Sequence, residues 1–184
     1  MSWNVVDLAH VPPQPWRNGG GVTRQLLALP DEQDWTVRIS VADVTRDGPF
    51  SSFPGVHRCF AVLSGEGVRL RVNGVDHDLT AQDPPLHFDG ADAVSCVLPG
   101  GATEDLNLMV RGRAARMERV RGSHTATCGA GALIAVFANK HATAIGDSQG
   151  QHNLQPRTLA WRILESSERL ELIGENVLWM EIEP

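Results

Sequence analysis

Residues 61–79 read AVLSGEGVRLRVNGVDHDL, and this stretch decides the fold. Apolar residues alternate with polar ones on both sides of Asn73-Gly74, and Asn-Gly between alternating runs is the strongest short hairpin signal. Gly65 and Gly67 interrupt the pattern once more, earlier in the stretch. We therefore expect three short strands in an antiparallel meander, joined by two tight turns.

A weaker copy of this pattern lies at residues 135–154, AVFANKHATAIGDSQGQHNL. The copies begin 74 residues apart and end 75 apart, with the extra residue in the hairpin turn. A repeated meander in a chain with little helix predicts an all-β fold of two antiparallel jelly-roll barrels in tandem. We place the N-terminal barrel at residues 1–115 and a more degenerate C-terminal barrel at residues 116–184.

Composition excludes several classes of function. The 184 residues include 16 Lys and Arg against 22 Asp and Glu, whereas nucleic-acid binders carry excess positive charge. Cys59, Cys96 and Cys128 have no paired spacing, so we expect buried, reduced thiols. The longest apolar run, residues 128–138, is too short to span a bilayer, and the N-terminus lacks an export pattern. We expect a cytoplasmic protein with no nucleic-acid or membrane partner.

Two further stretches, residues 36–44 and 105–111, alternate as strands with two unlike faces. Arg38 and Ser40 lie on the polar face of the first, and Asp105, Asn107 and Arg111 lie on that of the second. These faces would line a barrel if the apolar faces packed outward, but most polar strand faces point to water. The pattern leaves both orientations open.

The segment PWRNGGGVTRQL, residues 15–26, concentrates glycine, arginine and an anchor tryptophan. Backbone N–H groups of a glycine run can cradle an anion, and Arg17 and Arg24 could each pair with a carboxylate. A tight turn anchored by Trp16 is the alternative interpretation. The segment is not a nucleotide loop, because no Lys-Ser/Thr pair follows the glycines.

The sequence does not predict a metal centre. The hairpin VLSGEGVRLRVNG resembles the first conserved block of the cupin superfamily, whose metal-binding members carry two histidines and an acid shortly before it. Here that region offers only His57, and His87 is the only further candidate. Two histidines fall short of the three protein ligands of a catalytic metal site. We therefore expect no metal and no other cofactor.

A more specific resemblance rests on six blocks that occur in order. The chain resembles the HutD/Ves family of bicupin proteins over residues 3–111. The resemblance implies an association with bacterial histidine catabolism, an accessory or regulatory role in metabolite binding, and no established enzymatic activity. The blocks are PWRNGGGVTR (15–24), RISVADV (38–44), DGPFSSFPGVHR (47–58), LSGEG (63–67), FDG (88–90) and DLNLMVR (105–111).

The family motifs, matched residue by residue, also imply a set of ligand-binding residues, to which we add His57 because it adjoins Arg58. At three positions this sequence departs from the family pattern, with Gln25 and His57 where acids are usual and Val37 in place of a tryptophan. The complete set is Trp16, Arg17, Asn18, Thr23, Arg24, Arg38, Ser40, Phe50, Ser51, His57, Arg58, Asp105 and Asn107.

This set favours a metal-free, non-enzymatic protein whose N-terminal barrel binds a small carboxylate, such as urocanate or a formylated glutamate derivative. Arg24, Arg38 and Arg58 would pair with the carboxylate, because each guanidinium presents two parallel donors. The asparagine and serine side chains of the set would orient the rest of the ligand. The aromatic side chains would form an apolar wall.

Two other functions remain open at this point. One is a metal-independent isomerase or hydrolase with His57 or Asp105 as proton carrier. The other is an interaction module whose arginine-rich segment, residues 112–122, docks an acidic partner. The linear sequence does not separate these alternatives, because it does not show which strand faces converge. We also expect a homodimer, by analogy with other cupins.

Overall fold

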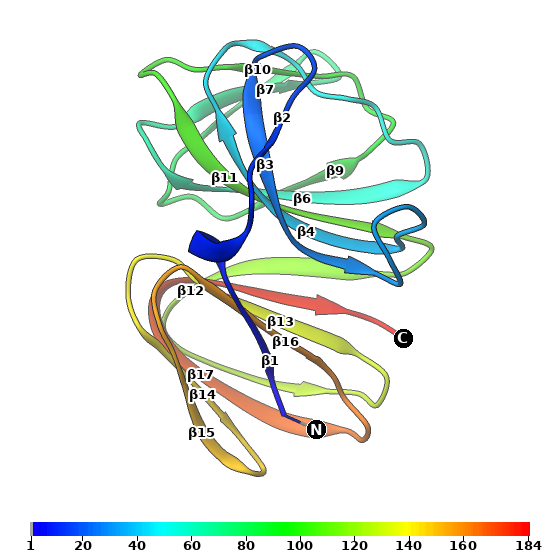
Figure 1. Cartoon of the computed structure of the whole chain (residues 1–184), viewed down its shortest axis with the longest axis vertical. Helices are drawn as coiled ribbons and strands as arrows, with labels where there is room; N and C mark the ends of the chain where they lie inside the picture. Colours follow the sequence, from blue (N-terminus) through cyan, green and yellow to red (C-terminus); the bar gives the residue numbers. More distant parts are fainter. Residues whose placement is uncertain (1) are drawn as a thin grey trace. The chain divides into compact units, whose positions relative to one another are not determined.

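The structure is a computed structural model that describes residues 2–184. One short 3-10 helix, η1 (Leu8–His10), is present, and the other regular elements of this range are β-strands (Figure 1). No helix within the described range is long and apolar enough to cross a membrane. The chain forms two compact units. One is Val11–Gly112, and the other is Arg113–Pro184 together with the N-terminal segment up to His10.

The N-terminal unit consists of two antiparallel sheets, and apolar side chains such as Phe60, Leu70 and Phe88 form its core. The six-stranded sheet has the order β2-β3-β4-β11-β6-β9, and the four-stranded sheet has the order β5-β10-β7-β8. The strands are β2 (Gln14–Pro15), β3 (Gly21–Leu29), β4 (Val37–Val44), β5 (Gly48–Pro49), β6 (Val56–Ser64), β7 (Val68–Val72), β8 (Val75–Leu79), β9 (Leu86–Asp89), β10 (Val94–Val97) and β11 (Thr103–Arg111).

The C-terminal unit is one antiparallel sheet of seven strands around a core that includes Ile134, Leu172 and Trp179. Its order is β1-β16-β13-β17-β14-β15, and β12 pairs with β17. These two long strands pair along their whole length, with an irregularity between Val120 and Arg121. The strands are β1 (Asn4–Asp7), β12 (Ala115–Cys128), β13 (Leu133–Ala138), β14 (Thr143–Asp147), β15 (Gly150–Leu154), β16 (Thr158–Ile163) and β17 (Glu168–Ile182).

Both copies of the repeated pattern form the same run of three strands, β6-β7-β8 and β13-β14-β15. The hairpin at Asn73-Gly74 is confirmed, with φ angles of 48° and 86° that suit the tight turn between twisted strands. The curled antiparallel sheets confirm the predicted all-β architecture of two jelly-roll barrels.

The expected meander is wrong at its first turn, because β6 and β7 belong to different sheets. Gly65 and Gly67 have φ angles of +95° and +107°, which L side chains rarely adopt. A Cβ atom on Gly67 would lie 2.5 Å from the carbonyl oxygen of Leu79. The two glycines therefore turn the chain from one sheet into the other, where a simple hairpin would have kept it in one sheet.

The units differ from the expected division at residue 115 mainly at the N-terminus. Strand β1 pairs with β16, and the backbone N–H of Leu8 donates to the carbonyl of Arg157. Residues 4–7 therefore complete the sheet of the C-terminal unit. Because residues 4–7 pair with residues 158–161, far away in the sequence, no local sequence pattern predicts this pairing.

The arginine-rich segment 112–122 lies mostly in strand β12 and is not a free connector. Its arginines have partners on β17 or beside it: Arg116 pairs with Glu181, and Arg113 donates to the carbonyl of Glu183. This segment is therefore part of a paired strand, and two of its arginines already have partners within the C-terminal unit.

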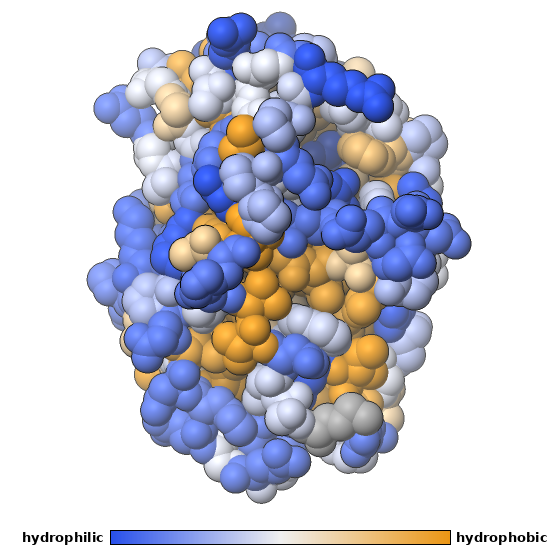
Figure 2. Space-filling model, viewed as in Figure 1, coloured by the Kyte–Doolittle hydropathy of each residue, from blue (hydrophilic) through white to orange (hydrophobic). Residues whose placement is uncertain are grey.

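The surface of the C-terminal unit is not uniformly polar. Figure 2 shows hydrophobic residues gathered over part of this unit. Val5 on β1 and Ile163 on β16 are 57% and 46% exposed. The neighbouring strands β1 and β16 thus carry exposed apolar side chains.

Candidate functional site

The N-terminal unit contains a cavity of about 470 Å³. This volume lies within the range of about 300–1,000 Å³ that is usual for small-molecule sites. Its walls combine aromatic and aliphatic side chains with cationic, amide and hydroxyl groups. The lining residues are Gln14, Pro15, Trp16, Arg17, Asn18, Thr23, Arg38, Ser40, Ala42, Val44, Pro49, Phe50, Ser51, Phe53, Arg58, Phe60, Asn107 and Met109.

The floor of the cavity comes from three adjacent strands of the six-stranded sheet. Met109 on β11 lies opposite both Arg38 on β4 and Arg58 on β6. Two residues earlier, Asn107 lies opposite Ser40, in the next row of the same face. Residues two apart on a strand share a face, so these rows point to one side. Of the polar strand faces noted in the sequence, Arg38, Ser40 and Asn107 therefore line the cavity, whereas Asp105 is buried outside its lining and Arg111 is exposed.

Arg58 is 7% exposed and lies at the centre of this floor. Its Nη2 donates to Oδ1 of Asn107 at 3.2 Å, and its guanidinium lies over the rings of Phe50, Phe53 and Phe88, 5.0–5.8 Å from their centroids. No carboxylate among residues 2–184 forms an ion pair with it, and its buried Nε has no hydrogen-bond partner there. Burial and then the charge of Arg38 lower its pKa to about 10.

Arg38 adds a second cation to the same floor. Burial lowers its pKa, with a smaller opposing effect from Glu32, and its guanidinium lies over the ring of Trp35. Its Nε is also buried without a partner among the described residues. The cavity therefore holds two desolvated guanidinium groups that lack a carboxylate counter-ion within the described chain.

The rim is formed in part by the glycine-rich segment. Trp16 Nε1 donates to Oγ1 of Thr23 at 2.7 Å, and Oδ1 of Asn18 accepts from the backbone N–H of Gly20. The N–H of Gly19 donates to the carbonyl of Trp16. A Cβ on Gly21 would lie 2.3 Å from the carbonyl oxygen of Asp43. The segment is therefore a tight turn anchored by Trp16, and its Gly19 and Gly20 N–H groups are already used within the turn.

All the candidate residues line the cavity except Arg24, His57 and Asp105. Arg24 instead forms an ion pair with Asp43 at 2.6 Å. Asp105 is fully buried on β11, where Oδ2 accepts from the hydroxyl of Thr103, and Oδ1 has no partner among the described residues. Burial raises the pKa of Asp105 to about 8, partly offset by the Thr103 hydrogen bond.

His57 lies on the face of β6 that points away from the cavity, beside Cys59 and near His87 of β9. Burial, followed by the nearby His87, lowers its pKa against a smaller opposing effect of Asp89. Burial also raises the pKa of the Cys59 thiol to about 12. Sequence reasoning noticed the two histidines but missed the cysteine, because the strand pairing that joins them was not visible.

Other cavity residues were also missed, and strand alternation could have found some of them. Phe60 follows Arg58 by two positions and Met109 follows Asn107 by two, so both share the cavity face. Phe53 and Pro49 come from the loop and short strand before β6. Their placement gave no periodic signal.

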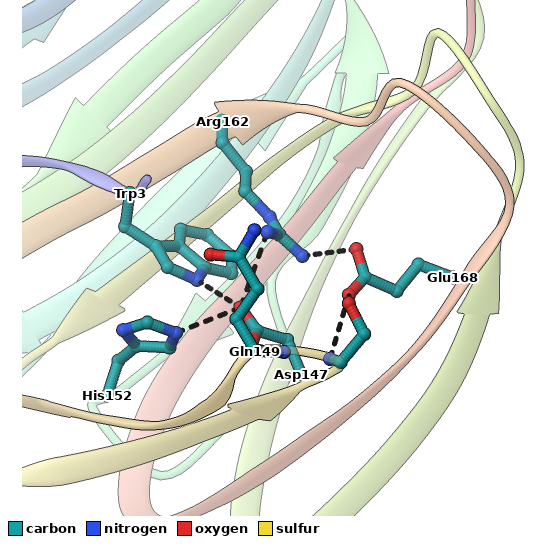
Figure 3. Close-up of polar contacts among 7 residues, drawn as sticks. Trp3, Asp147, Gln149, His152, Arg162 and Glu168 are labelled. Carbon is teal, nitrogen blue, oxygen red and sulfur yellow. Dashed lines mark hydrogen bonds and ion pairs between the residues drawn. The ribbon is translucent and has the colours of Figure 1, made fainter. Parts of the chain in front are cut away.

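The C-terminal unit holds a second polar cluster, drawn in Figure 3. Oδ2 of Asp147 accepts from Trp3 Nε1 at 3.0 Å and lies 3.0 Å from His152 Nε2 and 3.3 Å from Arg162 Nη1. Arg162 also forms an ion pair with Glu168, and its guanidinium lies over the ring of Trp3. Each buried charge here has a partner of opposite sign, so the cluster joins strands and binds the N-terminal segment to this unit.

The family model for HutD matches residues 8–180. The chain is a member of the HutD family. A 21.2 kDa protein in the hutC 3′ region of Pseudomonas putida is 34% identical over 134 residues, covering 71% of this chain and 70% of that protein. Protein Ves of Cronobacter sakazakii is 30% identical over 179 residues, 96% of either chain.

Solved structures agree with this membership of the HutD family. A conserved protein of unknown function from Pseudomonas aeruginosa is 28% identical with a TM-score of 0.88, covering both chains completely. HutD from Pseudomonas fluorescens, solved in a formate condition, is 26% identical with a TM-score of 0.87, covering 99% of this chain and 98% of that one. Salicylate 1,2-dioxygenase of Pseudoaminobacter salicylatoxidans shares only the fold, at 10% identity, a TM-score of 0.64, and coverage of 99% and 81%.

Proposed function

We propose that this HutD-family protein binds a small organic carboxylate in the cavity of its N-terminal unit, without a metal and without chemical conversion. The ligand would be a metabolite of histidine catabolism such as urocanate or a formylglutamate-like acid. The name HutD and the hutC-region relative support this metabolic setting. Binding would serve an accessory or regulatory role in the pathway.

The observation that carries the proposal is the pair of guanidinium groups in the cavity, of which that of Arg58 is buried and that of Arg38 is partly buried. Arg38 and Arg58 are desolvated, each keeps a buried Nε without a partner among residues 2–184, and neither forms an ion pair with a carboxylate in that range. A buried cation is costly unless it is paired. A bound carboxylate would supply the missing charge and accept the free N–H donors in a bidentate manner.

The remaining lining supports a planar or short-chain acid. Asn107 and Ser40 lie one row from the arginines and offer an amide and a hydroxyl for further hydrogen bonds. Phe50 and Phe60 have ring centroids 5.8 Å apart and provide an apolar wall. Small-molecule pockets commonly join such walls to a few convergent polar groups.

An isomerase or hydrolase has less support from this arrangement. The two candidate proton carriers, His57 and Asp105, do not line the cavity. His57 lies on the opposite face of its strand, and Asp105, although on the same face of β11 as Asn107, is fully buried outside the cavity lining. A general acid or base must reach the reacting atom directly or through one water molecule.

The test is calorimetric titration of the protein with urocanate, formylglutamate, formiminoglutamate, glutamate and formate, with and without a chelator. We expect one of these acids to bind with a stoichiometry of one molecule per chain, and we expect the chelator to leave its affinity unchanged. Arg38→Ala should weaken that binding at least tenfold, since a charge-assisted hydrogen bond contributes about 1.5–3 kcal/mol.

Arg69→Ala is the matched control, because Arg69 is an exposed arginine of the same unit, paired with Asp78 outside the cavity. It should leave the affinity unchanged. Equal affinity of the wild type and a folded Arg38→Ala variant would remove the arginine from the site. Binding of no acid, or turnover of the bound acid, would overturn the proposed function.

A further inference from the structure

Three side chains that could ligate a metal converge on the face of the six-stranded sheet opposite the cavity. Cys59 on β6 lies directly opposite His87 on β9, and His57 precedes Cys59 by two residues on the same face. Cross-strand pairs and i, i+2 neighbours bring side chains within contact distance. The potential ligand atoms, His57 Nε2, Cys59 Sγ and His87 Nδ1, form a group close enough to hold one ion.

The distances between these atoms match the edges of a metal tetrahedron. The two ring nitrogens are 3.3 Å apart, and the sulfur lies 3.5 Å from His57 Nε2 and 3.4 Å from His87 Nδ1. Tetrahedral Zn²⁺, with Zn–N of about 2.1 Å and Zn–S of about 2.3 Å, sets N···N about 3.4 Å and N···S about 3.6 Å apart. The side chains could therefore bind the ion with shifts of a few tenths of an ångström.

The donor set also indicates which ions fit. Thiolate together with imidazole favours borderline or soft transition metals such as Zn²⁺ and Co²⁺, and disfavours Mg²⁺ and Ca²⁺. Access is available, because His87 is exposed and His57 is only partly buried, whereas Cys59 is fully buried. Asp89 lies opposite His57 in the strand pair and adds negative charge beside the site.

We propose that His57 Nε2, Cys59 Sγ and His87 Nδ1 bind a single divalent transition-metal ion of the Zn²⁺ class, on the face of β6 opposite the cavity. Three protein ligands leave a fourth position for water, and the thiol releases its proton to solvent when the ion binds. The site is independent of the carboxylate proposal, because Arg58, between the two β6 ligands, points to the other face.

Cobalt provides the direct test, since Co²⁺ replaces Zn²⁺ in such sites and reports its ligands by absorption. The chelator-treated full chain is titrated with Co²⁺ and then with Zn²⁺. We expect one equivalent of Co²⁺, intense visible d–d bands typical of tetrahedral cobalt, and a near-ultraviolet charge-transfer band from sulfur. Zn²⁺ should then bleach these bands.

Matched variants separate the site from adventitious binding. Cys59→Ser should abolish the charge-transfer band, whereas Cys96→Ser, at a buried free cysteine of the same unit, should keep it. His87→Ala changes an exposed residue, so folding should be preserved, and it should weaken Zn²⁺ binding about a hundredfold or more. His77→Ala, on β8 and outside the cluster, should bind like the wild type.

Three results would overturn the proposal. The wild type could lack the charge-transfer band, the band could survive in Cys59→Ser, or His87→Ala could bind Zn²⁺ with unchanged affinity. In each of these cases the three atoms form a hydrogen-bonded group and not a metal site. Circular dichroism of every variant, compared with that of the wild type, checks that the fold is retained.

Discussion

The two units treat buried charge in opposite ways. In the N-terminal unit Arg58 is 7% exposed, and its guanidinium meets aromatic rings and an amide oxygen but no carboxylate among residues 2–184. In the C-terminal unit the side chain of Arg162 is 5% exposed and pairs with both Asp147 and Glu168. The buried arginine of the C-terminal unit thus has carboxylate partners, whereas the buried arginine of the N-terminal unit lies in a cavity without one among the described residues.

The buried acids of the two units show the same contrast. Burial raises the pKa of Asp105 to about 8, and the hydrogen bond from the hydroxyl of Thr103 offsets this only in part. For Asp147 burial acts in the same direction, but hydrogen bonds from the Gln149 backbone, Trp3 and His152 hold its pKa below the usual value. Removing one member of a buried pair leaves the other charge uncompensated, whereas Asp105, which lies outside the cavity lining, has only the hydroxyl of Thr103 as a partner among the described residues.

The largest effect should come from replacing the two buried arginines by methionine. Arg162→Met leaves Asp147 and Glu168 without their cation and should lower the free energy of unfolding by about 3–5 kcal/mol. Arg58→Met replaces an unpaired cation by an apolar side chain and should change it by less than about 1 kcal/mol. Urea denaturation of both variants measures the difference. Equal decreases in the free energy of unfolding would show that the two arginines do not differ in their contribution to stability.

The next effect concerns Asp105 and pH. Its pKa is raised from 3.8 to about 8 in the folded protein, so the folded state binds more protons than the unfolded state between these values. Stability attributable to this group is therefore full below about pH 4 and is lost as the pH rises toward 8.

Asp105→Asn should remove that loss, so the stability of the variant should fall less than that of the wild type between pH 4 and pH 8. Melting temperatures of both proteins from pH 4 to 8 provide the measurement. Parallel pH profiles would show that Asp105 ionises normally. Thr103→Val is a useful companion, because it removes the hydroxyl donor of the same carboxyl group.

A bound carboxylate should give Arg58 the partner of opposite charge that Arg162 already has in the C-terminal unit, and should stabilise the protein. At a concentration 100 times its dissociation constant, the bound carboxylate should stabilise the wild type by about 2.7 kcal/mol. Arg58→Met should lose this stabilisation while remaining folded. Denaturation with and without the acid tests this, and full ligand stabilisation in Arg58→Met would place the anion elsewhere.

The smallest predicted effect lies in the C-terminal network. Trp3→Phe removes the hydrogen bond to Asp147 but keeps an aromatic ring over Arg162, so it should cost about 1 kcal/mol. Denaturant unfolding at neutral pH provides the value. A loss as large as that of Arg162→Met would mean that Trp3 holds β1 in the sheet mainly by packing.

Much of the fold was predictable because its signals are local. Alternation located strands such as β4 and β11, Asn73-Gly74 located a hairpin, and the 74-residue repeat indicated two barrels. Most of the candidate cavity residues came from family-like motifs. The failures were non-local: the turn at Gly65 changes sheet, and β1 joins a strand far away in sequence.

The sequence by itself determined the strand content, the tandem repeat, the resemblance to the HutD family, and which residue types stand near one another in the chain. Only the tertiary structure decided that Arg38, Arg58 and Asn107 share one cavity, that Arg24 pairs with Asp43 instead, and that Cys59 joins two histidines. The reason is physical. Side-chain alternation within a strand is local, but the face that is enclosed depends on which strands pair and on how the sheets curl.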